Sequence, residues 1–176
     1  MIPTRTARDN RRSGHIIFKL FLLTMCIFAV VGVIYYVLIQ ISYSVRCSDQ
    51  LTRIYQALEL FEMDRGSLPQ LAYFPDEPLT DPDSIRVVLE EYGVDPQIWV
   101  CPTANSLISN LGMSYVWNTK LNGKNLRSFD ERQWVLIEIN ALSPDVPTPH
   151  IGYYNVLFTD GTVERIRDPI NTLKGF

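Results

Sequence analysis

The sequence has few of the residues from which enzyme and metal sites are commonly built. It contains two histidines and three cysteines, and of the histidines only His150 lies beyond the first 45 residues. It has no glycine-rich phosphate loop, no H-E-x-x-H helix and no nucleophile elbow. We therefore expect no enzymatic activity, no cofactor, no metal and no small-molecule substrate.

Charge is missing from one long segment near the start. The 26 residues from Leu20 to Val45 include no Lys, Arg, Asp or Glu. About 20 apolar residues cross the hydrocarbon core of a bilayer as a helix, and the core of a secretory signal is only about 7–15 residues long. The run predicts a transmembrane helix over residues 16–45. A removable signal, cut near the small residues Ser42 and Ser44, is the alternative.

The charges on the two sides of this run differ in sign. Five basic residues and one acid precede it, whereas eleven basic residues and eighteen acids follow it. Positive segments stay on the cytoplasmic side, so residues 1–15 are predicted to be a cytoplasmic leader and residues 46–176 an exported domain. The acidic domain has no basic stripe, which argues against a nucleic-acid partner. The first expected partner is the membrane lipid around residues 16–45.

The helix is expected to continue beyond the membrane. No Gly or Pro occurs between Val33 and Arg65, and apolar residues recur at helical spacing. They are Leu51, Ile54, Tyr55, Leu58 and Phe61. The pattern predicts an unbroken helix to about Met63, with one apolar stripe that the rest of the domain must cover.

The remainder of the domain is expected to be one short helix followed by strands. Asp81 is the predicted N-cap, with Pro82 at the first helical position and Gly93 at the end. Residues 113–117, 134–139, 153–158 and 163–166 are strand-like, and Asp160-Gly161 predicts a hairpin between the last two. The fold class is therefore α+β, with an antiparallel sheet packed on the exported half of the first helix.

The three cysteines fall in different environments. Cys26 lies in the membrane run, while Cys47 and Cys101 both lie on the exported side, where oxidation is permitted. We expect a disulfide between Cys47 and Cys101. Two free buried thiols are one alternative, and half of a metal site is another, although zinc takes four ligands and His150 is the one exported histidine.

Other polar residues are given structural roles. His150 is expected to be a structural or hydrogen-bonding residue, and Asp160 a turn residue, because the D-x-D-x-D-G spacing of a calcium loop is missing. The acidic, proline-rich segment 67–83 is interpreted as a solvated loop, with cation binding as the alternative. Trp99, Trp117 and Trp134 are expected in the core.

Several motifs resemble those of type IV pilins and type II secretion pseudopilins. Prepilin-type proteins have a basic leader, then G-F-T-L-I-E-L and an apolar run, and here Gly14 is followed by His15 and the run. One pilin-like family shows C-x-x-N-L-x-x-I-x-x-A-L after the membrane, then C-P, and ends in H-x-G-x-x-N-V-x-F-x-D-G-x-V. The chain matches these with Cys47, Leu51, Ile54, Ala57, Leu58, Cys101, Pro102, His150, Gly152, Asn155, Val156, Phe158, Asp160, Gly161 and Val163.

The resemblance implies a fold, a location and a class of partner. It implies a non-enzymatic, single-pass protein of the bacterial inner membrane, with a cytoplasmic N-terminus and a periplasmic or extracellular domain. Its partners would be other pilin-like or secretion-machine subunits, and Gly14 and His15 would flank the site of the leader peptidase.

Besides Gln50 in place of the Asn in the first motif, two positions near the start depart from the family pattern. His15 stands where the family has Phe, and Lys19 where it has a Glu that pairs with the N-terminal amine of a neighbouring subunit. A lysine there places two cations together at low dielectric. We therefore expect a minor or atypical subunit, or alternatively a signal-anchored binding or sensing domain that does not polymerise.

Overall fold

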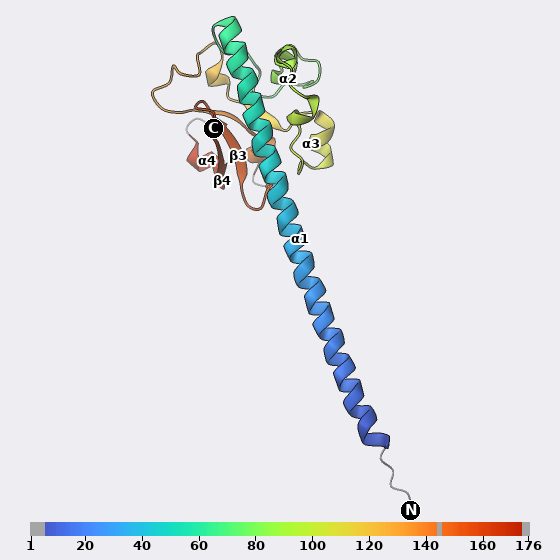
Figure 1. Cartoon of the computed structure of the whole chain (residues 1–176). Helices are drawn as coiled ribbons and strands as arrows, with labels where there is room; N and C mark the ends of the chain where they lie inside the picture. Colours follow the sequence, from blue (N-terminus) through green and yellow to red (C-terminus); the bar gives the residue numbers. More distant parts are fainter. Residues whose placement is uncertain (1–5, 144–145, 174–176) are drawn as a thin grey trace, which may run out of the picture. The chain divides into compact units, whose positions relative to one another are not determined.

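The computed structural model describes residues 6–143 and 146–173, with side chains from residue 16 onward. A 60-residue helix, α1 (Thr6–Arg65), is followed by short helices and by four strands (Figure 1). The strands are β1 (Tyr115–Trp117), β2 (Trp134–Glu138), β3 (Tyr154–Phe158) and β4 (Val163–Ile166). The short helices are α2 (Ile85–Val88), η1 (Glu90–Tyr92), η2 (Pro96–Trp99), α3 (Ser106–Leu111), η3 (Thr119–Leu121), η4 (Ile139–Leu142) and α4 (Pro169–Thr172).

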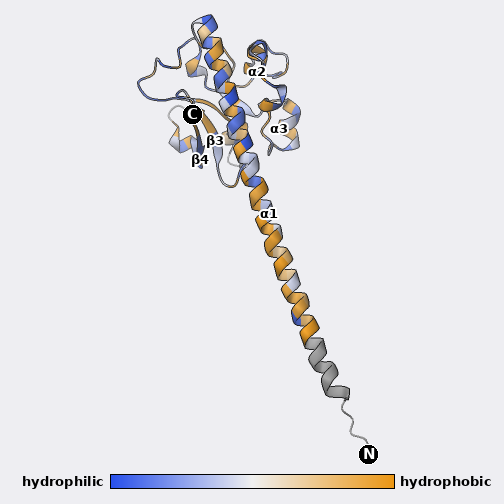
Figure 2. Cartoon of the chain, viewed as in Figure 1, coloured by the Kyte–Doolittle hydropathy of each residue, from blue (hydrophilic) through white to orange (hydrophobic). Residues whose placement is uncertain are grey.

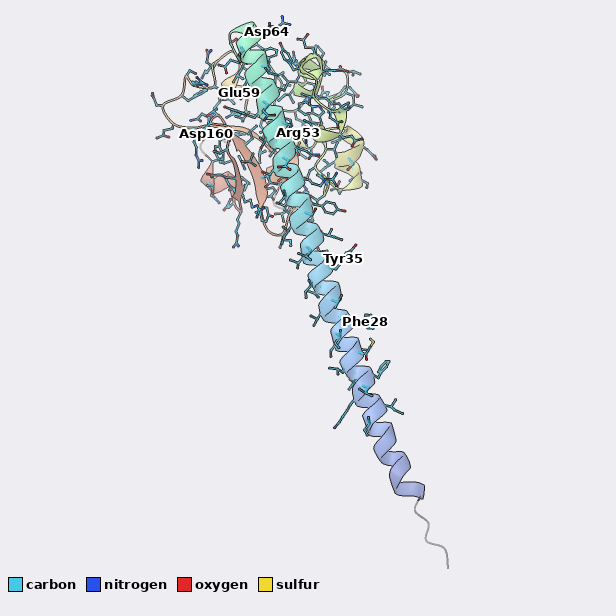
Figure 3. The ribbon with its side chains drawn as sticks, in the orientation of Figure 1. Phe28, Tyr35, Arg53, Glu59, Asp64 and Asp160 are labelled. Carbon is cyan, nitrogen blue, oxygen red and sulfur yellow. The ribbon has the colours of Figure 1, made fainter. Side chains whose placement is uncertain are left out.

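The chain divides after Ile41 into two units, residues 1–41 and 42–176. In the first unit the described part of α1, from Ile16 onward, is apolar on all sides except at Lys19, as the colouring in Figure 2 shows. Phe28 and Tyr35 project from it and are 70% and 66% exposed (Figure 3). By length and composition this part of α1 could cross a membrane.

In the second unit α1 buries one stripe. Cys47, Leu51, Ile54 and Leu58 are fully buried there, at the three- and four-residue spacing that places side chains on one helix face. The predicted helix is confirmed and passes through Arg46 without interruption. It ends at Arg65, and the next residue, Gly66, donates its N–H to the carbonyl of Glu62 at 2.8 Å and has a φ of +81°, which suits glycine.

The four strands form an antiparallel meander in the order β1-β2-β3-β4. The predicted α+β class with an antiparallel sheet is confirmed. The hairpin at Asp160-Gly161 is confirmed too, since β3 and β4 pair from Tyr154–Ile166 to Leu157–Val163 around it.

Each face of the sheet contributes to a different core. Tyr115, Trp117, Leu136 and Leu157 pack into the same buried cluster as the α1 stripe. The alternate residues of the same strands, with Ala141 and Leu173, form a second cluster. The side chains of Trp99, Trp117 and Trp134 are buried as expected.

The helix predicted from Asp81 is shorter than expected. Its α-helical part is confined to Ile85–Val88, its N-cap residue is Ser84, and η1 carries the chain on to Gly93. Asp81 instead accepts the N–H of Asp83 at 2.9 Å in the turn before the helix. Asx turns of this kind compete with the helical N-cap role for the same side chain.

Candidate functional site

Four buried side chains that can ligate a metal meet between α1 and the sheet. Cys47, Cys101, Glu138 and His150 each place one ligand atom within 4.8 Å of the others. The predicted disulfide is not formed, because Cys47 and Cys101 are free thiols. The two cysteines are nevertheless close together, since both sulfurs belong to this cluster.

Glu138 reaches the cluster from the end of β2. It is paired in register with Tyr115 of β1, and Leu136, two residues before it on the same face, packs in the core under α1. Its Oε2 accepts the backbone N–H of Asn155 from β3 at 2.9 Å. That bond orients the carboxylate so that Oε1 faces the cysteines and the histidine.

His150 is held by a tight turn before β3. The Thr148 hydroxyl donates to the carbonyl of His150 at 2.7 Å and accepts the Gly152 N–H at 3.3 Å. Gly152 has a φ of +71°, which a residue with a Cβ adopts only with strain. The neighbouring Tyr153 donates to Ser44 Oγ on α1 at 2.8 Å, so the turn is fastened to the helix that bears Cys47.

Cys101 is positioned by the segment that follows η2. Its N–H donates to Ser114 Oγ at 2.9 Å, and the Ser114 N–H donates to the carbonyl of Trp99 at 2.8 Å. These bonds fix the chain around Cys101 beside the start of β1. The Thr103 hydroxyl lies 3.1 Å from the Cys101 sulfur.

The polar atoms of the cluster converge on His150 Nε2 and Glu138 Oε1. Nε2 lies 2.7 Å from Glu138 Oε1 and 3.7 Å from Cys101 Sγ. Cys47 Sγ donates to Glu138 Oε1 at 3.0 Å and lies 3.3 Å from the Tyr115 hydroxyl. Every one of these residues is at least 98% buried.

Burial and proximity shift the acid–base properties of the cluster. Burial raises the pKa of Glu138 and raises that of Tyr115 well above its usual value. Interaction with the neighbouring Cys47 side chain, and then with His150 and Thr103, outweighs burial and lowers the pKa of Cys101 to about 4. Burial acts to lower the pKa of His150, but the hydrogen bonds to Cys101 and Glu138 outweigh it and raise the value to about 9.

The hydrogen bonds do not satisfy the whole cluster. His150 Nδ1 and both polar atoms of the Asn155 side chain are buried without a hydrogen-bond partner among the described residues. Unpaired buried polar atoms cost about 1–3 kcal/mol each. Hydrogen bonding among these residues therefore does not by itself explain why they are buried together.

The other predicted residues lie apart from the cluster or outside the described side chains. Gly14 and His15 fall in α1 where side chains are not described, and the Lys19 side chain is exposed. Phe158 is a buried β3 residue beneath the Arg132 guanidinium. Asp160 takes the predicted turn role, since it accepts the Thr162 N–H at 3.0 Å, and its residue is exposed.

Glu138 is the functional candidate that sequence analysis missed. Counting only histidines and cysteines gave three exported ligands and half a metal site. The missed signal is a single acid inside the apolar strand-like run from Trp134 to Ile139. A single charged residue in such a run indicates either an edge strand or a buried side chain that pairs with the charge.

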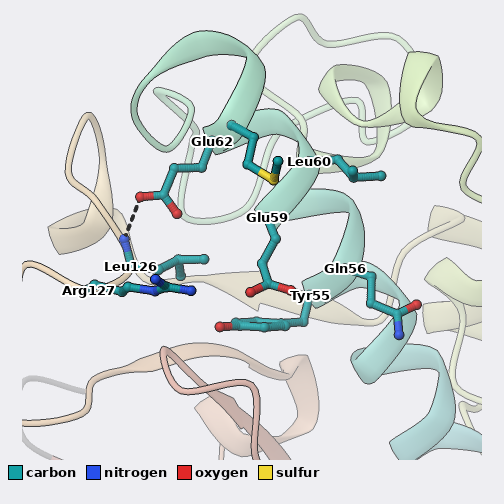
Figure 4. Close-up of a pocket in the computed structure, with 8 residues that line it drawn as sticks. Tyr55, Gln56, Glu59, Leu60, Glu62, Leu126 and Arg127 are labelled. Carbon is teal, nitrogen blue, oxygen red and sulfur yellow. Dashed lines mark hydrogen bonds between the residues drawn. The ribbon is translucent and has the colours of Figure 1, made fainter.

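A surface hollow of about 670 Å³ lies at least two turns further along α1 than Cys47. Figure 4 shows Tyr55, Glu59 and Glu62 extending from α1 toward Leu126 and Arg127. Glu62 Oε1 accepts the Leu126 N–H at 3.0 Å, which closes one end of the hollow. It contains no cysteine or histidine and is separate from the buried cluster.

Comparison with known proteins gives no relative: no protein family, no curated protein and no solved structure matches this chain.

Proposed function

We propose that the protein is a single-pass, membrane-anchored, pilin-like or pseudopilin-like subunit whose exported domain acts through protein contacts and not through catalysis. In this proposal residues 16–45 span the bacterial inner membrane, the N-terminus is cytoplasmic and residues 46–176 are exported. The partners are other pilin-like or secretion-machine subunits.

One observation carries this proposal: α1 changes character near Ser44. Before it, large apolar residues such as Phe18, Phe28 and Ile34 are more than half exposed. Exposure of so large an apolar surface to water is unfavourable, whereas lipid or neighbouring helices would cover it. After it, the helix buries a single stripe against a sheet. The motif resemblance set out above supports the same arrangement.

Three measurements test the anchor and the leader. Full-length protein should remain in the membrane after alkaline extraction, and external protease should digest residues 46–176 in spheroplasts. Processing after Gly14 would lower the intact mass by that of residues 1–14. A chain released into the soluble fraction, or cut near Ser44, would overturn the anchored proposal.

A non-polymerising, signal-anchored binding or sensing domain is the second candidate, and Lys19 favours it. The side chain of Lys19 is exposed on an otherwise apolar stretch of α1. Its cation would face the N-terminal amine of a neighbouring chain in a filament core.

In-membrane crosslinking separates the two candidates. A pilin-like subunit should crosslink to secretion-machine subunits in wild-type membranes. Crosslinks that are absent in both the wild type and Lys19→Glu, with localisation unchanged, would favour the monomeric anchored domain. Arg53→Glu, an exposed charge reversal on the exported part of α1, is the matched control.

A further inference from the structure

We propose that Cys47, Cys101, Glu138 and His150 bind one zinc ion as a closed structural site. Two thiolates, one imidazole nitrogen and one carboxylate oxygen form a four-ligand set that suits tetrahedral Zn²⁺. All four ligands come from the protein, which is the pattern of structural sites and not of catalytic ones.

The spacing of the ligand atoms fits this ion. Around a tetrahedral zinc, neighbouring donors lie about 3.4–3.8 Å apart, from the usual metal–ligand distances. Cys101 Sγ and His150 Nε2 are 3.7 Å apart, and all four ligand atoms are within 4.8 Å of one another. The Cys47–Glu138 and His150–Glu138 separations are 3.0 Å and 2.7 Å, so binding would lengthen them by at least about 0.4 Å and 0.7 Å.

Groups around three of the four ligands are arranged as supporting partners, whereas His150 Nδ1 has none among the described residues. The free oxygen of Glu138 accepts the Asn155 N–H, and hydroxyl groups approach each sulfur: Tyr115 at Cys47 and Thr103 at Cys101. Ligating carboxylates and thiolates are usually held by such hydrogen bonds. The signature residues Cys47, Cys101, His150 and Asn155 thereby acquire a common physical role.

A nucleophilic triad does not fit the same atoms. In a Ser–His–Asp type arrangement the nucleophile and the acid contact different nitrogens of the histidine ring. Here Cys101 and Glu138 both approach Nε2, while Nδ1 has no partner among the described residues. Ligand groups that approach the same nitrogen are instead arranged as they would be around one bound ion. The cluster is also closed to solvent, which leaves a substrate no access.

A positive centre would also stabilise the buried carboxylate. A fully buried carboxylate costs several kcal/mol unless it is paired. Among the described residues, the one cationic side chain within ion-pair distance of Glu138 is His150. A zinc ion supplies two positive charges to the carboxylate and the thiols at once.

The site would join segments far apart in the sequence. Cys47 belongs to α1, Cys101 follows η2, Glu138 ends β2 and His150 precedes β3. One ion therefore ties the exported part of α1 to the sheet and to two loops. It would hold the domain on its helix without a disulfide.

Metal analysis of full-length protein, purified from membranes in detergent without chelators, tests the proposal. We expect one zinc per chain and three free thiols after denaturation. A zinc-free chain with a Cys47–Cys101 disulfide, or a full complement of another metal, would overturn it. Chelation should lower the unfolding temperature of the zinc-loaded wild type.

Variants with matched controls locate the site. Glu138→Gln and His150→Gln should lose zinc to the background level, whereas Cys26→Ser and His15→Gln should keep one zinc per chain. Zinc retained in His150→Gln would overturn the assignment of ligands.

Cobalt substitution of the wild type covers the case in which the variants fail to fold. The cobalt protein should show thiolate charge-transfer absorption and tetrahedral visible bands. An octahedral spectrum without thiolate bands would reject the site.

Discussion

Tyr55 of α1 lies directly against Gly161 in the β3–β4 hairpin. A Cβ added to Gly161 would come 2.8 Å from Tyr55 Cε1, and the Tyr55 hydroxyl donates to the carbonyl of Thr159 at 3.1 Å. Glycine is therefore needed at this position for two reasons: its φ is +80°, and the Tyr55 ring leaves no room for a Cβ. This contact fixes the hairpin to the helix.

The contact predicts that Gly161→Ala destabilises the domain more than a glycine replacement without a neighbour. Gly66→Ala is the control, because its φ of +81° is the same but nothing lies within 4 Å of the added Cβ. The backbone strain alone costs about 1–2 kcal/mol, and the Tyr55 clash adds to it. Thermal unfolding in detergent would measure both variants. Equal losses would show that the ring simply moves aside.

Leu58 and Leu60 test the burial of the α1 stripe. Leu58 is fully buried and Leu60 is 51% exposed on the same helix. Leu58→Ala should cost about 2–5 kcal/mol of unfolding free energy by leaving a cavity, and Leu60→Ala less than about 1. Denaturant unfolding compares them. Similar values would mean that α1 is not packed on the sheet.

Asn122 joins two segments that are distant in sequence. Its Oδ1 accepts the Trp117 Nε1–H at 2.8 Å and the Leu71 N–H at 3.2 Å, while its Nδ2 donates to the Leu71 carbonyl at 2.9 Å. Asn122→Ala should cost about 2–4 kcal/mol, because it leaves these groups unpaired.

Asn125→Ala is the control for Asn122→Ala. This exposed side chain makes one bond to the Gly66 carbonyl at 3.0 Å, so its removal should cost under about 1 kcal/mol. Tryptophan fluorescence during unfolding reports both variants. A loss as small in Asn122→Ala as in Asn125→Ala would contradict the bridging role.

Asp160 predicts a small dependence of stability on acid pH. Partial burial acts to raise its pKa, but the hydrogen bonds from Thr162 and the nearby Arg132 outweigh burial and lower it. Stability from the ionised form is present above the unfolded-chain pKa of about 3.9 and is lost as the pH falls through the lower folded value.

Asp160→Asn keeps the acceptor oxygen and removes the charge. The wild type should be more stable than this variant at neutral pH, by less than about 1 kcal/mol because the site is exposed, and the difference should vanish in acid. Unfolding temperatures across the acid range measure it. Thr162→Val, which removes one donor to Asp160, should show a weaker pH dependence of stability than the wild type. A difference in stability between the wild type and Asp160→Asn that persists in acid would refute the assignment.

Much of the local structure follows from short-range patterns in the sequence. The uncharged run and the absence of Gly and Pro specify α1, and Asp160-Gly161 specifies the last hairpin, because these signals act within a few residues. The helix expected at Asp81 was shorter because an Asx turn uses that side chain locally.

Only the tertiary structure decided that Glu138 belongs with Cys47, Cys101 and His150. Glu138 is 91 residues from Cys47 and 12 from His150, and Cys101 is 49 from His150. What unites them is the register of β2 against β1, the turn at Gly152 and the face of α1 that meets the sheet. Strand register and helix packing are settled by the burial of the whole core, and no local pattern encodes them.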